Sequence, residues 1–187
     1  MIGAGLVTVE KFYDFTDTRP DEERWELIDG TLLLNEPRAY RHQVILGNLI
    51  YTFGLAERQR EVPWFSIPGV GIRASDISRP QVDFMVLRQE TESHDPQRRD
   101  VDDSILLCEI VSPDTADRDL GRKREIYTNL PSLTHYMVVT QDAVDVVVFA
   151  RDAKFQERHL NSIDKALDLP SLGISLPLSQ IYRDSGL

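Results

Sequence analysis

Apolar positions recur at helical spacing in several parts of this chain. Thr8 is a plausible N-cap for a short helix that runs to about Phe15. A long helix is expected from about Tyr40 to Arg60, because one stripe of it is apolar. The stripe consists of Ile45, Leu46, Leu49, Ile50 and Phe53, together with His42 if histidine is counted as apolar. Residues 117–130, which precede Pro131, predict a further helix.

Strand-like runs lie between these helices. Asp29-Gly30 separates two short apolar runs, and Asp-Gly suits a type I′ turn, so residues 24–34 predict a β-hairpin. Other strands are expected at residues 64–72 (bent at Pro68-Gly69), 82–87, 105–111, 135–140 and 144–150. We expect residues 89–103 to form an exposed loop and the C-terminal tail to form short elements on the rim.

The order of these elements predicts an α/β (mixed α+β) fold. Helices would flank a central mixed β-sheet whose strands pair mostly antiparallel, with the hairpin near the N-terminus as an addition. The 187 residues are 41% apolar and 28% charged, which fits one domain spanning residues 1–187. No internal repeat, low-complexity segment or linker interrupts it.

Composition narrows the classes of function. No apolar run approaches the roughly 18 residues of a membrane-spanning helix, and the first residues lack the basic leader of a secretory signal. The single cysteine, Cys108, excludes an internal disulfide and a cysteine-based zinc site, so we expect a cytoplasmic protein. The net charge of −10 argues against general electrostatic attachment to nucleic acid, but leaves room for a local basic patch.

One carboxylate stands inside an otherwise apolar strand. Residues 105–111 read I-L-L-C-E-I-V, and both faces of this strand are apolar, so a central position in the sheet is expected. A charge there costs several kcal/mol unless it is paired, protonated or bound to a metal. Glu109 is therefore a candidate site residue.

The preceding strand repeats this anomaly with Asp83. Two carboxylates on neighbouring strands could converge on one hard cation such as Mg²⁺, which could orient a water for attack on a phosphodiester. The alternative for each acid is a strand-end carboxylate that reaches water or an arginine. For the pair, the pattern favours a metal site.

The helix after the Glu109 strand carries Asp119, Lys123 and Tyr127 at four-residue spacing, on one face. Lys123 could project back toward Glu109 and offer a cation to a reacting phosphate. Spacing alone favours the alternative, an ordinary surface ion pair between Asp119 and Lys123.

The stretch from Glu109 to Val139, E-I-V-S-P-D-T-A-D-R-D-L-G-R-K-R-E-I-Y…H-Y-M-V-V, resembles the signature of the Uma-type restriction endonuclease family. That family, long catalogued as a domain of unknown function, belongs to the PD-(D/E)XK nuclease superfamily. W-E-L-I-D-G at residues 25–30, His42 and the Asp83 strand extend the resemblance over roughly residues 22–181.

The resemblance implies a restriction-endonuclease-like core in which Asp83 and Glu109 bind the metal, Mg²⁺ or Mn²⁺. The superfamily's usual lysine position, two residues after the glutamate, is Val111 here. In the family that this chain resembles, the lysine lies in the following helix instead, and Lys123 matches that position. The resemblance therefore makes Lys123 the favoured cationic partner of the site.

His42 and Glu26 also match the family pattern. The ordinary interpretation of His42 is a satisfied core histidine, and that of Glu26 is an exposed hairpin acid; the resemblance adds both to the candidate catalytic set. Val82 replaces the proline of the superfamily name, and residues 136–140 read Y-M-V-V-T instead of Y-W-L-V-D. These departures concern packing and partner surfaces more than the chemistry.

The leading hypothesis is a Mg²⁺-dependent endonuclease that hydrolyses DNA through a metal-activated water. Arg118, Arg122 and Arg124 flank Lys123 and are candidates for phosphate contacts, although they equally fit a solvated helix face. The alternative is a catalytically inactive nuclease fold that serves as an interaction module, and a weaker option is an enzyme acting on another phosphate ester. A symmetric homodimer would be the simplest way to cut both strands.

Overall fold

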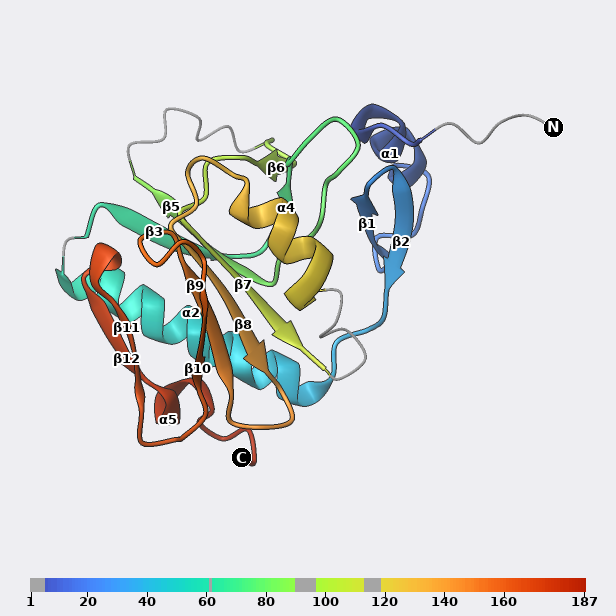
Figure 1. Cartoon of the computed structure of the whole chain (residues 1–187). Coiled ribbons are helices and arrows are strands. Elements are labelled where there is room, and N and C mark those ends of the chain that lie inside the picture. Colours follow the sequence, from blue (N-terminus) through green and yellow to red (C-terminus); the bar gives the residue numbers. More distant parts are fainter. Residues whose placement is uncertain (1–5, 61, 90–96, 113–118) are drawn as a thin grey trace.

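The computed structural model describes residues 6–60, 62–89, 97–112 and 119–187, apart from the side chains of residues 60 and 119 (Figure 1). The N-terminal elements are α1 (Val9–Thr16), β1 (Arg24–Ile28), β2 (Thr31–Asn35), α2 (Tyr40–Arg60), β3 (Trp64–Pro68) and β4 (Gly71–Ile72). The middle elements are β5 (Phe84–Arg88), β6 (Asp100–Val101), β7 (Leu106–Val111), the π-helix η1 (Asp119–Lys123) and α4 (Arg124–Thr128). The C-terminal elements are β8 (His135–Thr140), β9 (Val146–Ala150), β10 (Glu157–Leu160), β11 (Ala166–Leu169), the 3₁₀-helix η2 (Pro170–Leu172), β12 (Ile174–Pro177) and α5 (Leu178–Ile181).

Within the described residues, the central sheet has six strands in the order β10-β9-β8-β7-β5-β3. Strands β7 and β8 pair in parallel, and the other neighbours in this sheet pair antiparallel. Every residue of β7 is buried, which confirms the central position that its two apolar faces predicted. The predicted mixed sheet and its flanking helices are therefore present.

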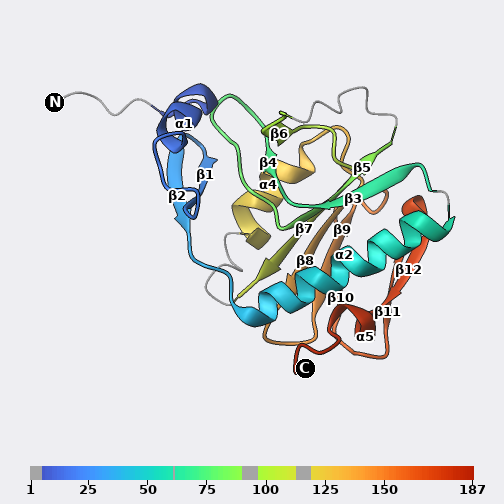
Figure 2. The ribbon, with the colours of Figure 1, turned by 180° about the vertical axis from the view of Figure 1, so that it is seen from behind.

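Helices cover both faces of this sheet (Figures 1 and 2). Ile45, Leu49 and Phe53 of α2 pack on one face, in a core cluster that includes the alternating strand residues Leu106, Cys108 and Ile110. Ile126 and Tyr127 of α4 pack on the opposite face with Leu107 and Val111. Glu109 lies between Leu107 and Val111 at every-second-residue spacing, so its side chain points to the same face of the sheet as theirs, the face covered by α4.

Strands β1 and β2 form a separate hairpin beside the central sheet (Figure 1). Asp29 has φ 51° and Gly30 has φ 74°, the left-handed pair that a type I′ turn requires. The hairpin docks through Leu27 and Arg79, whose backbones exchange two hydrogen bonds of 3.1 and 2.6 Å. This docking brings the face of β1 that carries Glu26 against the body of the protein.

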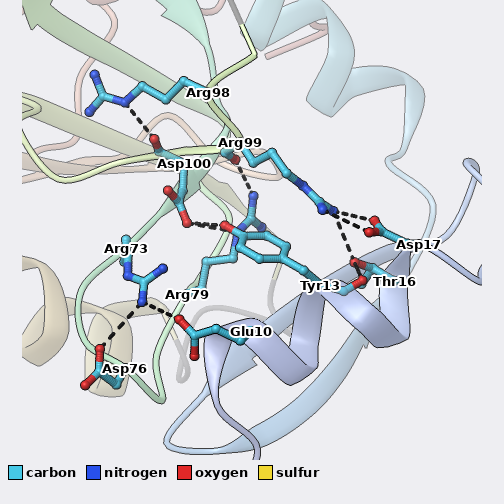
Figure 3. Close-up of polar contacts among 10 residues, drawn as sticks. All are labelled: Glu10, Tyr13, Thr16, Asp17, Arg73, Asp76, Arg79, Arg98, Arg99 and Asp100. Carbon is cyan, nitrogen blue, oxygen red and sulfur yellow. Dashed lines mark hydrogen bonds and ion pairs between the residues drawn. The ribbon is translucent and has the colours of Figure 1, made fainter. Parts of the chain in front are cut away.

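A polar network ties α1 to the segment around β6 (Figure 3). The Tyr13 hydroxyl donates a hydrogen bond to Asp100, and Arg99 forms an ion pair with Asp17 at 2.8 Å. The buried Arg79 donates to the backbone oxygen of Arg99 at 2.6 Å. The guanidinium of Arg79 also lies over the rings of Phe12 and Tyr13 in α1, and its backbone pairs with Leu27 of the hairpin, so Arg79 contacts both α1 and the hairpin.

Several predicted elements match, and three differ. Thr8 accepts a hydrogen bond from Lys11 N and caps α1, and α2 spans the predicted residues. The loop expected at 89–103 contributes β6, which pairs with β4 in parallel. The C-terminal tail does not lie on the rim, because its apolar residues belong to the core cluster under α2. The helix after β7 begins, within the described residues, as a π-helix, which sequence periodicity does not reveal.

Candidate active site

Glu109 lies in the middle of β7 and is 1% exposed. Its Oε1 accepts hydrogen bonds from Lys123 Nζ at 3.0 Å and from the Tyr127 hydroxyl at 2.8 Å. Burial, followed by the charge of Glu109, raises the pKa of Tyr127 well above its usual range, so the hydroxyl stays protonated and donates. The buried carboxylate is therefore paired by two donors from the helix that follows β7.

Lys123 is the last residue of η1 and is also 1% exposed. Its ammonium lies 3.0 Å from Glu109 Oε1, 3.0 Å from Glu26 Oε2 and 2.9 Å from the backbone oxygen of Gln81. The predicted projection of Lys123 toward Glu109 is confirmed, and a surface location for this lysine is wrong. One ammonium thus holds two buried carboxylates together.

Glu26 comes from β1 and has no exposed surface, so the interpretation of an exposed hairpin acid is wrong. Besides its contact with Lys123, its Oε2 accepts a hydrogen bond from Gln81 N at 3.0 Å. The docked hairpin therefore delivers the second carboxylate of a buried cluster, which we call the lysine cluster: Glu26, Glu109, Lys123 and Tyr127.

Asp83 directly precedes β5, and the pairing of Phe84 with Cys108 places it opposite Glu109 in the register of the two strands. Asp83 Oδ1 lies 2.7 Å from Arg38 Nη2, and Oδ2 accepts a hydrogen bond from Ile110 N at 2.8 Å. Burial alone would raise the pKa of Asp83, but His42, Arg38 and the Ile110 N–H outweigh it and lower the pKa. Asp83 is therefore ionised near neutral pH.

His42 faces inward from the first turns of α2, as its place on the apolar stripe predicted, and is 3% exposed. Its Nε2 lies 3.2 Å from Asp83 Oδ2, close enough for electrostatic attraction but without the geometry of a hydrogen bond. We call Arg38, His42 and Asp83 the aspartate cluster. It is held by side chains at the start of α2, whereas η1 and α4 hold the lysine cluster from the opposite face of the sheet.

A cavity of about 570 Å³ opens beside the aspartate cluster. It lies at the carboxyl ends of the parallel strands β7 and β8, where Ser112 and Gln141 line it together with Arg38 and His42. A smaller cavity of about 140 Å³ reaches Asp83 itself. The carboxyl ends of parallel strands are a frequent position for ligand sites in open sheets.

The profile of the Uma2 family, described as "Putative restriction endonuclease", matches residues 9–179. The chain belongs to the Uma2 family. In sequence it is similar to the uncharacterized protein slr1290 of Synechocystis sp., with 30% identity over 79 residues. That match spans 42% of this chain and 42% of the relative's length.

A solved structure has the same fold. It is a crystal structure from Anabaena variabilis, described as a putative nuclease belonging to DUF820. It superposes with a TM-score of 0.77, covering 94% of this chain and 97% of the other at 12% sequence identity. Among the described residues of this Uma2 chain, no helix has the length and hydropathy needed to cross a membrane.

The arginines flanking Lys123 already contact acidic or aromatic side chains. Arg122 pairs with Asp29 at 2.6 Å and with Glu125 at 2.7 Å, so part of its charge is neutralised on the surface. Arg124 stacks over the ring of Phe149 with 4.5 Å to the centroid. Arg118 lies outside the described residues. A contact between these arginines and nucleic acid remains a prediction.

Sequence reasoning on this Uma2 chain missed Arg38, which holds Asp83, and did not include Tyr127 in the candidate set. Arg38 follows Pro37 and precedes α2 by two residues, and nothing in the hydrophobic periodicity connects it to a carboxylate 45 residues away. Tyr127 carried a signal, because it lies one helical turn after Lys123 on the same face.

Proposed function

We propose that this protein is a metal-dependent endonuclease that hydrolyses DNA phosphodiester bonds. The observation that carries the proposal is the position of Lys123, buried between Glu26 and Glu109 at 3.0 Å from each. Buried ion pairs contribute little to stability compared with well-packed apolar side chains, so such a cluster favours a functional role. The family description and the nuclease description of the structural neighbour support the same reaction class.

The metal in this proposal is Mg²⁺ or Mn²⁺, with Asp83 and Glu109 as its protein ligands. The described residues contain no group of three or more histidines, cysteines and carboxylates arranged to hold a metal. The strand register places Asp83 and Glu109 in adjacent positions, and Mg²⁺ is usually bound by one or two carboxylates while it keeps several waters. The pair differs from structural zinc sites, which are built from four cysteine and histidine ligands.

The protein groups have distinct roles in the proposed reaction. Lys123 would stabilise the negative charge that develops on the phosphate, while Glu26 and Tyr127 hold Lys123 and Glu109 in place. Arg38 and His42 orient Asp83 and keep it ionised. The bound metal would supply Lewis acidity and an activated water for in-line attack.

A second candidate function is an inactive nuclease fold that acts as an interaction module. The observation that favours it is that cationic side chains already hold both proposed ligands: Lys123 holds Glu109, and Arg38 holds Asp83. DNA as the partner and a homodimer that cuts both strands are parts of the first proposal. An interaction module requires neither metal binding nor cleavage, so experiment separates the two.

The test combines plasmid cleavage with metal titration. The wild-type protein should convert supercoiled plasmid to nicked or linear DNA with Mg²⁺ or Mn²⁺, and Asp83→Asn should lower the rate by about a hundredfold or more. Asp168→Asn, at an exposed carboxylate bonded to Ser175, is the matched control and should cut normally. Calorimetry should detect metal binding to wild type that is weakened in Asp83→Asn.

Two results would contradict the endonuclease. One is a folded wild-type protein that neither binds metal nor cuts DNA, which would favour the interaction module. The other is equal metal binding by wild type and Asp83→Asn, which would place the metal elsewhere.

A further inference from the structure

The 570 Å³ cavity beside the aspartate cluster is lined by polar atoms without partners. Asn35 Nδ2, Arg38 Nε and His42 Nδ1 are buried, and none of them makes a hydrogen bond with the residues that the structure describes. His42 is 97% buried, and Arg38 is anchored at its far end by the 2.7 Å contact of Nη2 with Asp83. These three polar nitrogens come from the last residue of β2 (Asn35), from the connection to α2 (Arg38) and from the first turn of α2 (His42).

Burying an unsatisfied polar atom costs about 1–3 kcal/mol, and folded proteins leave few of them. Asn35 Nδ2 and Arg38 Nε can only donate, and His42 Nδ1 donates in one tautomer or in the cation. Buried nitrogens that lack hydrogen-bond partners and gather around one cavity indicate a ligand that brings acceptor oxygens. The cavity volume lies within the range of small-molecule sites, about 300–1,000 Å³.

The electrostatic surroundings select an anion. Helix α2 has 21 residues and begins at Tyr40, so the positive end of its dipole lies beside Arg38, Ala39 and His42, which line the cavity. Arg38 adds a positive charge, which its ion pair with Asp83 at 2.7 Å partly offsets. The carboxylate in the lining is Glu36, which is exposed and can turn to solvent.

We propose that this cavity binds a phosphate group of a nucleic acid chain through Asn35, Arg38 and His42. The proposal rests on the proposed nuclease function and adds a substrate-binding site to it. Arg38 joins this site to Asp83, so the bound phosphate would lie next to the carboxylate proposed to hold the metal. The chemistry recognised is a phosphate oxyanion, carried either by a nucleic acid backbone or by a free nucleotide.

The site can be tested without metal, so that no cleavage takes place. Binding of a short fluorescein-labelled DNA, single-stranded and duplex, is measured by anisotropy in EDTA. Asn35→Ala removes one donor, and Arg38→Lys keeps the positive charge near Asp83 but loses Nε. Each should weaken binding about tenfold. Asn161→Ala and Arg183→Lys alter the same residue types away from the cavity and should bind as wild type.

Competition distinguishes the two sources of phosphate. If inorganic phosphate and thymidine 5′-monophosphate displace the DNA from wild type but not from Asn35→Ala, a single phosphate is sufficient. If neither competes while both variants bind DNA more weakly, the site requires a chain. Both outcomes support the cavity as a phosphate site, and thermal melting checks that the variants are folded.

The proposal is overturned if folded Asn35→Ala and Arg38→Lys bind DNA within twofold of wild type, or if wild type binds no DNA in EDTA. Failure of the endonuclease would look different. In that case DNA binding and its loss in the variants would persist, while addition of Mg²⁺ or Mn²⁺ would produce no cleavage.

Discussion

Replacing Lys123 by methionine removes the ammonium that joins two buried carboxylates while nearly preserving side-chain volume. The variant loses contacts of 3.0 Å to Glu26, 3.0 Å to Glu109 and 2.9 Å to the Gln81 oxygen. Removing one partner of a buried ion pair costs about 3–5 kcal/mol, because the remaining charge stays desolvated and unpaired. We expect the free energy of unfolding to fall by this amount.

A double-mutant cycle tests whether the loss arises from the cluster. Glu26→Gln in the Lys123→Met background leaves one carboxylate, which still accepts a hydrogen bond from Tyr127. The double variant should therefore be more stable than the sum of the single losses predicts, by about 1–3 kcal/mol. Urea unfolding at pH 7.5, followed by far-UV circular dichroism, measures all four proteins.

Lys165→Met is the matched control, since Lys165 is exposed and its ammonium donates a hydrogen bond of 3.1 Å to Asn161. Its free energy of unfolding should change by less than about 0.5 kcal/mol. The reasoning is refuted if Lys123→Met costs less than about 1 kcal/mol, or if the two cluster substitutions are additive.

Three further predictions follow from the pKa directions. Burial raises the pKa of the Cys108 thiol well above its usual range, so iodoacetamide at pH 8 should label it only in urea; rapid labelling of the native protein would contradict its burial. Because the pKa of Asp83 is lowered from 3.8, its contribution is present above that pH and is lost as the pH falls through the folded value. Asp83→Asn should therefore cost about 2 kcal/mol at pH 7 and less at pH 3 in urea titrations, whereas an equal cost at both would exclude this linkage. Hydrogen bonds that His159 donates to Glu157, and then to Asp145, raise its pKa above 6.5. The stabilisation from this pair is therefore present below pH 6.5 and is lost as the pH rises through the folded value. His159→Gln should cost at most a few tenths of a kcal/mol at pH 5.5 and nothing at pH 9, because this pair is exposed and screened; a larger loss at pH 9 would reverse the sign.

The elements that local patterning specifies were predictable from the sequence. Helix α2, the Asp29-Gly30 hairpin and the central strand β7 each follow from periodicity or turn chemistry within a few residues. The contact between Lys123 and Glu109 was also predictable, because the two residues are close in sequence and the family resemblance placed the lysine in the helix after the Glu109 strand.

Contacts between distant segments could not be predicted in the same way. The burial of Glu26 depends on docking of the hairpin against residues around Arg79, and the Arg38–Asp83 pair joins the start of α2 to the start of β5. Hydrophobic periodicity reports which face of an element is buried, but not which charged side chain it meets there. The C-terminal strands were misplaced for this reason, because their short apolar runs do not reveal that they cover the core under α2.

The hairpin that carries Glu26 also determines when Lys123 can be reached. A two-stranded hairpin alone is marginally stable in water, so its brief detachment requires less free energy than global unfolding. While it is docked, Lys123 is shielded from solvent, and acylating reagents can modify its amine only after local opening. The acetylation rate of this one lysine would therefore report how often the N-terminal hairpin detaches from the rest of the protein.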